Sequence, residues 1–320
     1  DGDVGSIPSY EYSKYFSIDS EKQLEYATFG KNYGLVRFAM PGYTGVQAQK
    51  AAKFYASQRA YEFRGEFPTY INSYSQAEEF INSELGRSDF ITMAFPSHGY
   101  IGNYFNADTR LVPLTGDIMG GESRYANAYS SYHVPFAGNN SILPRVLRLP
   151  FKVDIQGESV LNIAGIQPIK IVNGNSVVFG GRAPSISDSY RFIHIRRIQS
   201  NYVRLFMESQ ALMEQLFSPN QPGLMEHLIM SLESFARREY KKGVFSRYVD
   251  FSKAARIGDA SRTQERINSG DREALVSVLN GKMNLFFRYI PTGILEELTV
   301  EVSPDTVVAD FGSSLDAPSR

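Results

Sequence analysis

The 320-residue sequence contains no cysteine, no tryptophan and no long run of apolar residues. The absence of cysteine excludes a disulfide scaffold, an iron–sulfur cluster, a thiolate zinc site and a cysteine nucleophile. No stretch approaches the roughly 20 apolar residues of a membrane-spanning helix, so we expect no membrane insertion. The net charge is only −1, which argues against a protein that binds nucleic acid through its overall charge.

Motifs for catalysis and ligand binding are also missing. The sequence has no G-x-S-x-G elbow, no P-loop and no complete dinucleotide fingerprint. Its four histidines show no two-histidine metal spacing, and His194 and His227 are expected to be structural, on a strand and on the polar side of a helix. We therefore expect no catalytic residue, no cofactor and no metal. Two alternatives stay open, namely an α/β enzyme of hydrolase type that uses Ser97 or His98, and a monomeric binding module with a tyrosine-rich face.

The first half of the chain alternates strand and helix patterns. Thr44 is expected to cap the first helix, and Gly86 to end the second. The expected strands are residues 35–40, 90–95 and 132–136, and the expected helices are residues 45–63, 75–85 and 123–129. This order predicts an α/β domain with a mainly parallel sheet.

The second half predicts an α+β domain with two long helices and short strands. Asn173-Gly174 is a hairpin turn signal between strands at 169–172 and 176–179. The other expected elements are a strand at 192–195 that continues into a helix at 195–217, a second helix at 222–242, a polar and mobile segment at 250–272, and strands at 285–290 and 298–302 joined as a hairpin. Gly243 is expected to end the second helix.

Charge is unevenly distributed along the chain. Residues 192–272 carry 13 basic and 9 acidic side chains, whereas residues 291–320 carry six acidic and one basic. These two regions are complementary within one subunit or between neighbours, or they belong to an ordinary mixed surface. The candidate interface residues are the basic Arg196, Arg197, Lys241 and Lys242 and the acidic Glu296, Glu297 and Glu301.

Three motifs follow one another between residues 161 and 198: LNIAGIQPI from Leu161, VVFGGR from Val177 and YRFIHIRRI from Tyr190. In this order the sequence resembles the contractile tail sheath proteins of myovirus-type bacteriophages. That family has a GIN-x-I segment, a glycine turn, an aromatic-Gly-small-Arg-Thr segment and a Y-I-x-V-R-R entry to a long helix. The matching structural residues of this chain are Phe179, Gly180, Gly181 and Arg182. Phe179 replaces the family's usual tryptophan, which suggests a distant branch such as that of a giant phage.

The resemblance implies a structural protein of the virion that is made in the host cytoplasm and is not an enzyme. Sheath subunits assemble with copies of themselves into sixfold rings stacked helically around the tail tube protein, and they also meet the baseplate and tail terminator proteins. Contraction of the sheath drives the tube through the host envelope and delivers the genome, with no nucleotide required.

The resemblance also predicts a domain order. Residues 1–165 are expected to form the outer or middle α/β domain, and residues 166–320 the tube-proximal domain. The basic residues Arg196, Arg197, Lys241 and Lys242 are then candidates for contact with the tube or an adjacent subunit. Asp1 and Arg320 fit the ends of a protease-trimmed fragment, which is expected to be monomeric without terminal arms.

Overall fold

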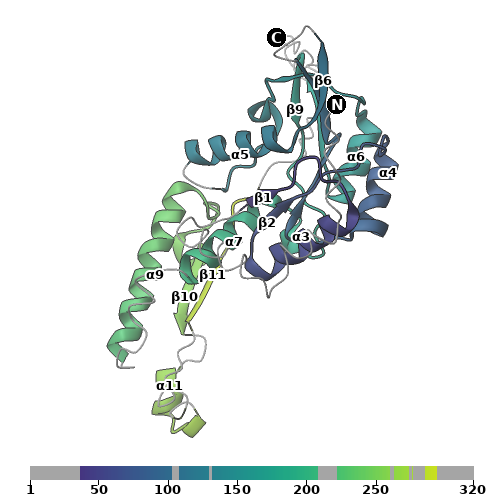
Figure 1. Cartoon of the computed structure of the whole chain (residues 1–320). Helices are drawn as coiled ribbons and strands as arrows, with labels where there is room; N and C mark the ends of the chain where they lie inside the picture. The colour runs from purple at the N-terminus through teal and green to yellow at the C-terminus, as the bar shows by residue number, and fades with distance from the viewer. Residues whose placement is uncertain are drawn as a thin grey trace, which may run out of the picture.

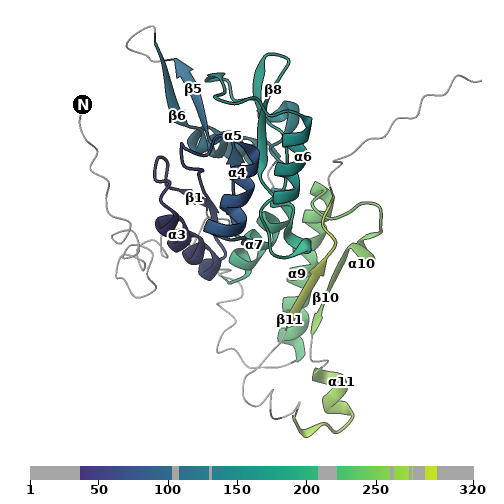
Figure 2. The same cartoon turned by 90° about the vertical axis from the view of Figure 1, so that its right-hand side faces the viewer.

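The structure is a computed structural model that describes residues 37–102, 108–129, 132–207, 222–259, 263–273, 276 and 285–293. Two regions are visible in Figures 1 and 2. An N-terminal region contains several small sheets flanked by helices, and a C-terminal region contains a long helix beside a two-stranded sheet. Among the described residues, no helix is both long enough and apolar enough to cross a bilayer.

A three-stranded parallel sheet lies in the N-terminal region. Its strands are β1 (Arg37–Ala39), β2 (Glu62–Arg64) and β3 (Ile91–Thr92), paired in that order, and its helices are α3 (Val46–Arg59), α4 (Tyr74–Glu79) and the π-helical η1 (Phe80–Leu85). The predicted strand at 35–40 and both predicted helices are confirmed. Gly86 ends η1 with a φ of 78°, as expected.

Two details of the predicted first helix are wrong. Its N-cap is Gly45, which provides no side-chain cap, rather than Thr44. The helix ends at Arg59 because Ala60 adopts a left-handed conformation with a φ of 53°. The three residues from Glu62 then form strand β2 instead of a last helical turn. Two of these residues, Glu62 and Arg64, are buried charged residues.

The predicted strand at 90–95 is divided between two sheets at Met93. Its second half, β4 (Ala94–Phe95), pairs in parallel with β8 (Gln167–Val172), which forms a hairpin with β9 (Asn175–Val178). Asn173 and Gly174 have φ angles of 51° and 79°, as a two-residue hairpin turn with two left-handed residues requires. The hairpin prediction is confirmed.

The other sheets are antiparallel. Strand β5 (His98–Gly102) lies between β6 (Thr109–Pro113) and β7 (Val146–Arg148). The helices of this part of the chain are α5 (Thr115–Tyr129), η2 (Gly138–Ser141) and α6 (Ile155–Ala164). The predicted helix at 123–129 is the last part of α5, whereas residues 132–136 form no strand. Parallel pairs occur in the β1-β2-β3 sheet and between β4 and β8, and the other described pairs are antiparallel. The predicted parallel sheet is therefore confirmed only in part, and the fold is mixed α+β.

The C-terminal region begins with η3 (Asp188–Tyr190) and α7 (Ile193–Met207), and continues with α9 (Pro222–Lys242), α10 (Phe251–Ala254), β10 (Ala255–Asp259), α11 (Thr263–Asn268) and β11 (Leu285–Tyr289). The two predicted long helices are confirmed as far as they are described. Of the strand predicted at 192–195, only Phe192 makes a β-bridge, with Arg182, and α7 begins at Ile193, so His194 is helical. The segment predicted as polar and mobile contains β10, which pairs antiparallel with β11. The predicted strand at 298–302 lies outside the described residues.

Apolar side chains form three clusters. One lies around the parallel sheet and a second around β8, β9 and α5; the third, which we call the aromatic cluster, joins α7 to α9, β10 and β11. The second cluster contains Ile169 and Val178 together with Leu114 and Ile118. Contacts therefore cross the predicted boundary between residues 165 and 166, and the division of the assembled protein into domains stays a prediction.

Candidate assembly interface

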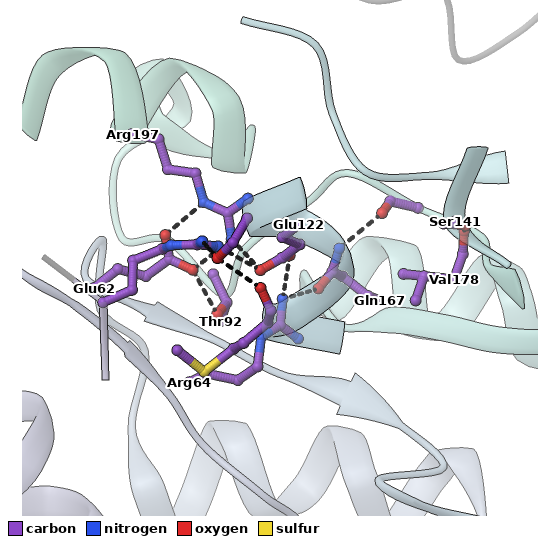
Figure 3. Close-up of polar contacts among 12 residues, drawn as sticks. Glu62, Arg64, Thr92, Glu122, Ser141, Gln167, Val178 and Arg197 are labelled. Atoms are coloured by element: carbon purple, nitrogen blue, oxygen red, sulfur yellow. Dashed lines mark hydrogen bonds and ion pairs between the residues drawn. The ribbon is translucent and has the colours of Figure 1, made fainter. Parts of the chain in front are cut away.

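Arg197 lies in the first turns of α7 and is buried against the parallel sheet (Figure 3). Its Nε and Nη2 atoms donate to the two carboxylate oxygens of Glu62 at 2.5 and 2.6 Å. Nη2 also lies 3.0 Å from Oε2 of Glu122 on α5. A bidentate pair of this kind fixes the orientation of both side chains. The interface role predicted for Arg197 stays a prediction, and within the subunit its guanidinium joins α7 to β2 and α5.

Glu122 gathers the remaining charges of this group. It accepts from Nη2 of Arg64 at 2.6 Å and from Nη1 of Arg37 at 2.8 Å. Arg64 also donates to Oε1 of Gln167 on β8 at 2.9 Å, and Figure 3 shows Gln167 on the far side of Arg64 from Glu62. We call Arg37, Glu62, Arg64, Glu122 and Arg197 the ionic junction. It holds three arginines against two glutamates, and Nε and Nη1 of Arg64 have no hydrogen-bond partner among the described residues.

The pKa values of the ionic junction follow from burial and from these pairs. Burial alone would raise the pKa of Glu62, but Arg197, Arg37 and Arg64 outweigh burial and lower it to about 2. Burial lowers the pKa of Arg64, and the nearby glutamates only partly compensate. For Arg197 the two glutamates prevail over burial and raise the pKa. Glu62 is therefore ionised at neutral pH.

The residues of the family motif hold the start of α7 in place. The carbonyl of Gly181 accepts from the backbone N–H of Ile193 at 2.9 Å, and Arg182 forms an antiparallel bridge with Phe192. The carbonyl of Gly180 accepts from Nε2 of Gln167 at 3.0 Å. These contacts join the β8–β9 hairpin to the first turn of α7. Glycine is favoured at position 180 because a Cβ atom there would lie 2.9 Å from Cδ of Pro168 and 3.0 Å from Oδ1 of Asn162.

Two further close contacts lie near the β8–β9 hairpin. The amino group of Lys170 lies 3.2 Å from the ring centre of Phe179, a cation–π contact. Gly165 ends α6 with a φ of 78°, and a Cβ atom there would lie 2.2 Å from the carbonyl oxygen of Ala183. Only glycine fits this position, because both its conformation and its neighbour exclude a side chain.

Arg196 lies beside the ionic junction but has different contacts. Its guanidinium carbon is 3.8 Å from the ring centre of Phe90 and 4.9 Å from that of Tyr190. Nη1 donates to Gln199 at 2.6 Å. Burial lowers the pKa of Arg196, with Tyr190 and Asp89 opposing this shift. The residue packs between two rings and is only half buried, and its interface role stays a prediction.

Lys241 and Lys242 lie in the last turn of α9, and both are exposed. Lys242 donates to Oε1 of Glu239 at 2.7 Å. The other oxygen of Glu239 accepts from the Tyr202 hydroxyl at 2.8 Å, so α9 is joined to α7 at this point. Burial, followed by the charge of Glu239, raises the pKa of Tyr202. Of the four basic candidates, these two lysines are the exposed ones.

The acidic candidates Glu296, Glu297 and Glu301 lie outside the described residues. The described chain before them ends at the C-terminal end of α9. There Thr292 donates from its backbone N–H to the carbonyl of Val244 at 3.0 Å, and from its hydroxyl to that of Gly243 at 2.6 Å. Thr292 therefore lies beside the C-terminal end of α9.

Comparison with known proteins gives matches in structure but not in sequence. No protein-family model and no curated protein matches the sequence. A chain of the anti-feeding prophage helical sheath in its contracted state superposes with a TM-score of 0.66 at 17% identity, over 84% of this chain and 70% of that one. A chain of the PVC sheath complex, from an extracellular contractile injection system in its contracted state, gives 0.65 at 15% identity, over 85% and 71%.

This chain has the fold of a contractile sheath protein. A chain of the contracted anti-feeding prophage baseplate matches it as well, with a TM-score of 0.65 at 19% identity, over 84% of this chain and 72% of that one. The resemblance drawn from the three sequence motifs is thus confirmed for the fold. The matched chains come from sheath and baseplate assemblies.

The contacts of Ser97 and His98 give no support to the alternative that the chain is a hydrolase. The Ser97 hydroxyl accepts from the backbone N–H of Phe67 and donates to its carbonyl, both at 3.1 Å. It lies 3.4 Å from Nδ1 of His98, whose pKa is lowered by burial without a charged partner. Among the described residues, no group of three or more histidine, aspartate and glutamate side chains is placed to hold a metal ion.

Sequence reasoning missed Glu62 and Glu122, the buried acids that bind Arg197, and Arg64, which also binds Glu122. Glu62 and Arg64 are two residues apart and lie on the same face of β2. Two charged residues flanking a phenylalanine in a short strand are the only local signal. Their partners lie 58 and 135 residues away along the chain, so the junction was not accessible to motif reasoning.

Proposed function

We propose that this chain is a subunit of the contractile tail sheath of a bacteriophage. The observation that carries the proposal is the match of about 84% of the chain to the contracted sheath of the anti-feeding prophage. The three ordered sequence motifs support it independently, because they were identified without the structure. Neither the enzyme nor the binding-module alternative is favoured by a specific observation.

The proposed subunit assembles with its own copies into sixfold rings stacked around a tail tube protein. The baseplate and the tail terminator protein contact the two ends of the sheath, and contraction drives the tube through the host envelope for genome delivery. The energy of contraction would come from the difference in packing between two lattices, so the subunit needs no nucleotide. The subunit is synthesised in the host cytoplasm and becomes part of the virion.

Within the subunit, we assign residues 166–320 to the side that faces the tube and residues 1–165 to the outside. The exposure of Lys241 and Lys242 at the end of α9 supports a contact there with the tube or an adjacent subunit. Arg197 is left out of this contact because Glu62 and Glu122 already bind its guanidinium.

Negative-stain electron microscopy of the full-length product of the gene tests the proposal. We expect long hollow tubes of uniform diameter, since a sheath subunit polymerises helically. The 320-residue chain should be imaged beside it, with discrete single particles expected. Compact particles from the full-length product at every concentration and salt would contradict a sheath role.

The lysine assignment has its own test. The double variant Lys241→Glu/Lys242→Glu in the full-length protein should shorten or abolish the tubes at low salt. The matched control is Lys50→Glu/Lys152→Glu, which makes the same change in charge at exposed positions of the N-terminal region. Tubes of normal length from the first variant, or an equal loss from both, would overturn the assignment while leaving the sheath role intact.

A further inference from the structure

The C-terminal end of α9 and the chain that follows it carry a patch of exposed basic side chains. Glu239 in this stretch is buried and is bound by Tyr202 and Lys242. The only exposed acidic residue among residues 237–253 is Asp250. We call the exposed basic side chains of these residues the basic patch: Arg237, Arg238, Lys241, Lys242, Arg247 and Lys253. Tyr248 in the same stretch is 99% exposed, and tyrosine and arginine are enriched on surfaces that bind another protein.

A patch of the opposite charge lies on helices α4 and η1. Residues 72–84 contain three glutamates and no basic residue, and we call Glu78, Glu79 and Glu84 the acidic patch. None of the three forms an ion pair within the described part of the chain. Because η1 is π-helical and its hydrogen bonds join residues five apart, Glu79 and Glu84 lie one turn apart on the same face, and both are exposed.

The two patches lie on opposite sides of the molecule, so they do not meet within one subunit. Figure 1 shows α9 along the left side and α4 at the right side, with sheets of the N-terminal region between them. A surface that is basic on one side and acidic on the other is complementary to a second copy of itself. Such a contact is head-to-tail, because it joins different surfaces of the two copies and leaves one patch of each free for a further copy. It therefore produces rings or helices rather than symmetric pairs.

We propose that the basic patch of one subunit contacts the acidic patch of the next. The proposal rests on the proposed sheath role, since it takes the partner to be another copy of this chain, and it assigns an adjacent subunit rather than the tube to Lys241 and Lys242. The basic side chains face the carboxylates of Glu79 and Glu84, and Tyr248 supplies apolar surface at the contact. Charge pairs of this kind determine which surfaces meet and accelerate association more than they raise affinity. The contact is accordingly sensitive to salt.

Cysteine cross-linking between two chains tests the contact, because the protein has no native cysteine. The first chain carries Ser252→Cys, beside Lys253, and the second carries Ser83→Cys, beside Glu84; both serines are exposed. In the control pair the second chain carries instead Thr109→Cys, which is exposed at the start of β6. At low salt a short bismaleimide should form the heterodimer of the first pair about tenfold faster than that of the control pair. At about 1 M salt the screening length falls to about 3 Å, and most of this advantage should disappear.

Charge reversal shows whether these two patches are responsible. Arg238→Glu/Lys241→Glu in the first chain, or Glu79→Lys/Glu84→Lys in the second, should each reduce the rate to that of the control pair. Mixing the two reversed chains should restore the rate, because the facing charges are again complementary. The control pair is measured with the same reversals, so that the effect of the altered net charges is subtracted. None of the four replaced side chains forms an ion pair within the described residues, so the subunit itself should fold normally.

Three results would overturn the proposal. The heterodimer could form no faster than the control, its rate could be unchanged by charge reversal, or two Ser252→Cys chains could join faster than the mixed pair, which would indicate a symmetric contact. The cross-linked peptides distinguish these products. Because the measurement uses subunits in solution, it is separate from tube formation. Tubes from the full-length protein without the specific cross-link would reject this contact and leave the sheath role intact, whereas the specific cross-link without tubes would support the contact and contradict the sheath role.

Discussion

Helix α7 passes through two cores of different chemistry. Its first turns place Arg197 in the ionic junction with Glu62 and Glu122. Farther along the helix Tyr202 and Phe206 enter the aromatic cluster, where the ring centres of Tyr202 and Phe235 are 5.2 Å apart at 82°. The rings of the cluster meet mostly edge to face, and the energy of such a contact depends only weakly on the exact orientation of the rings. The junction depends on every charge having a partner, whereas the cluster depends mainly on buried area.

This difference predicts which core is less tolerant of a single change. Removing one member of a buried ion-pair group leaves a desolvated charge unpaired. Removing one polar atom from the cluster leaves the rings in place. The predictions below test this contrast, from the largest expected effect to the smallest.

The largest effect is expected for Glu122→Gln. The amide keeps the shape of the side chain but leaves Arg37, Arg64 and Arg197 facing a neutral group. We expect a loss of about 3–5 kcal/mol in the free energy of unfolding, as for other broken buried pairs, measured by urea denaturation. The control is Glu158→Gln, because the ion pair of Glu158 with Lys170 is partly exposed and should be worth at most about 1 kcal/mol. Equal losses from both variants would show that the junction is not energetically distinct.

Acid should weaken the junction before the aromatic cluster. The pKa of Glu62 is lowered from 4.5 to about 2, so the folded state binds this proton less tightly than the unfolded chain does. The stabilisation is complete above about pH 4.5 and is lost as the pH falls toward 2. A shift of this size corresponds to roughly 3 kcal/mol.

Amide hydrogen exchange, corrected for the intrinsic effect of pH, locates this loss. Between pH 5 and pH 3 we expect protection to fall in β2 and α5 before it falls in α9 and β10. Simultaneous loss in both regions would mean that the two cores unfold as one unit and that the contrast has no thermodynamic meaning.

A smaller effect is expected in the aromatic cluster. Tyr202→Phe removes the hydroxyl that donates to Glu239 at 2.8 Å but keeps the ring among its neighbours. Glu239 retains Lys242 as a partner, so we expect a loss of about 1–2 kcal/mol in urea denaturation. Phe206→Leu, which changes a ring and no hydrogen bond, is the matched comparison. A loss from Tyr202→Phe as large as that from Glu122→Gln would contradict the contrast.

Sequence reasoning was most successful where structure is determined locally. The α9 helix, with proline at its start and Gly243 at its end, and the Asn173-Gly174 hairpin were predicted because their signals lie within a few residues. The motifs around Gly180 and Arg197 indicated the sheath fold, although no family model matches. Each of these features is encoded by neighbouring residues.

Prediction failed where distant residues decide the structure. Strand β2 is too short to show the alternation of apolar and polar residues that marks a strand. Its pairing with β1 and β3 ends the helical pattern that the preceding residues suggested. The 90–95 run gave no sign that its two halves belong to different sheets. The ion pairs of Arg197 with Glu62 and Glu122 were not predicted, because the two glutamates lie far from it in the sequence. Ion pairs between distant residues leave almost no local signal.

The smallest effect is expected for Glu66, a buried carboxyl four residues from Glu62 with no basic partner among the described residues. It accepts from the backbone N–H of Gly42 at 2.9 Å and from the hydroxyl of Thr115. Burial raises its pKa, and these two hydrogen bonds oppose the rise only in part. The folded state therefore binds this proton more tightly than the unfolded chain, and the contribution to stability grows as the pH falls, opposite in sign to that of Glu62.

Glu66→Gln tests this sign directly. Because the amide carries no charge to desolvate, the variant should be as stable as the parent at pH 7 or more stable by up to about 1 kcal/mol, and it should lose that advantage near pH 4. Urea denaturation at the two pH values measures the difference, with Glu158→Gln as the exposed control. If Glu66→Gln instead lowers stability at pH 7 and not at pH 4, the carboxylate is stabilised by its hydrogen bonds more than burial penalises it. Arginine partners would then not be what distinguishes the two buried glutamates.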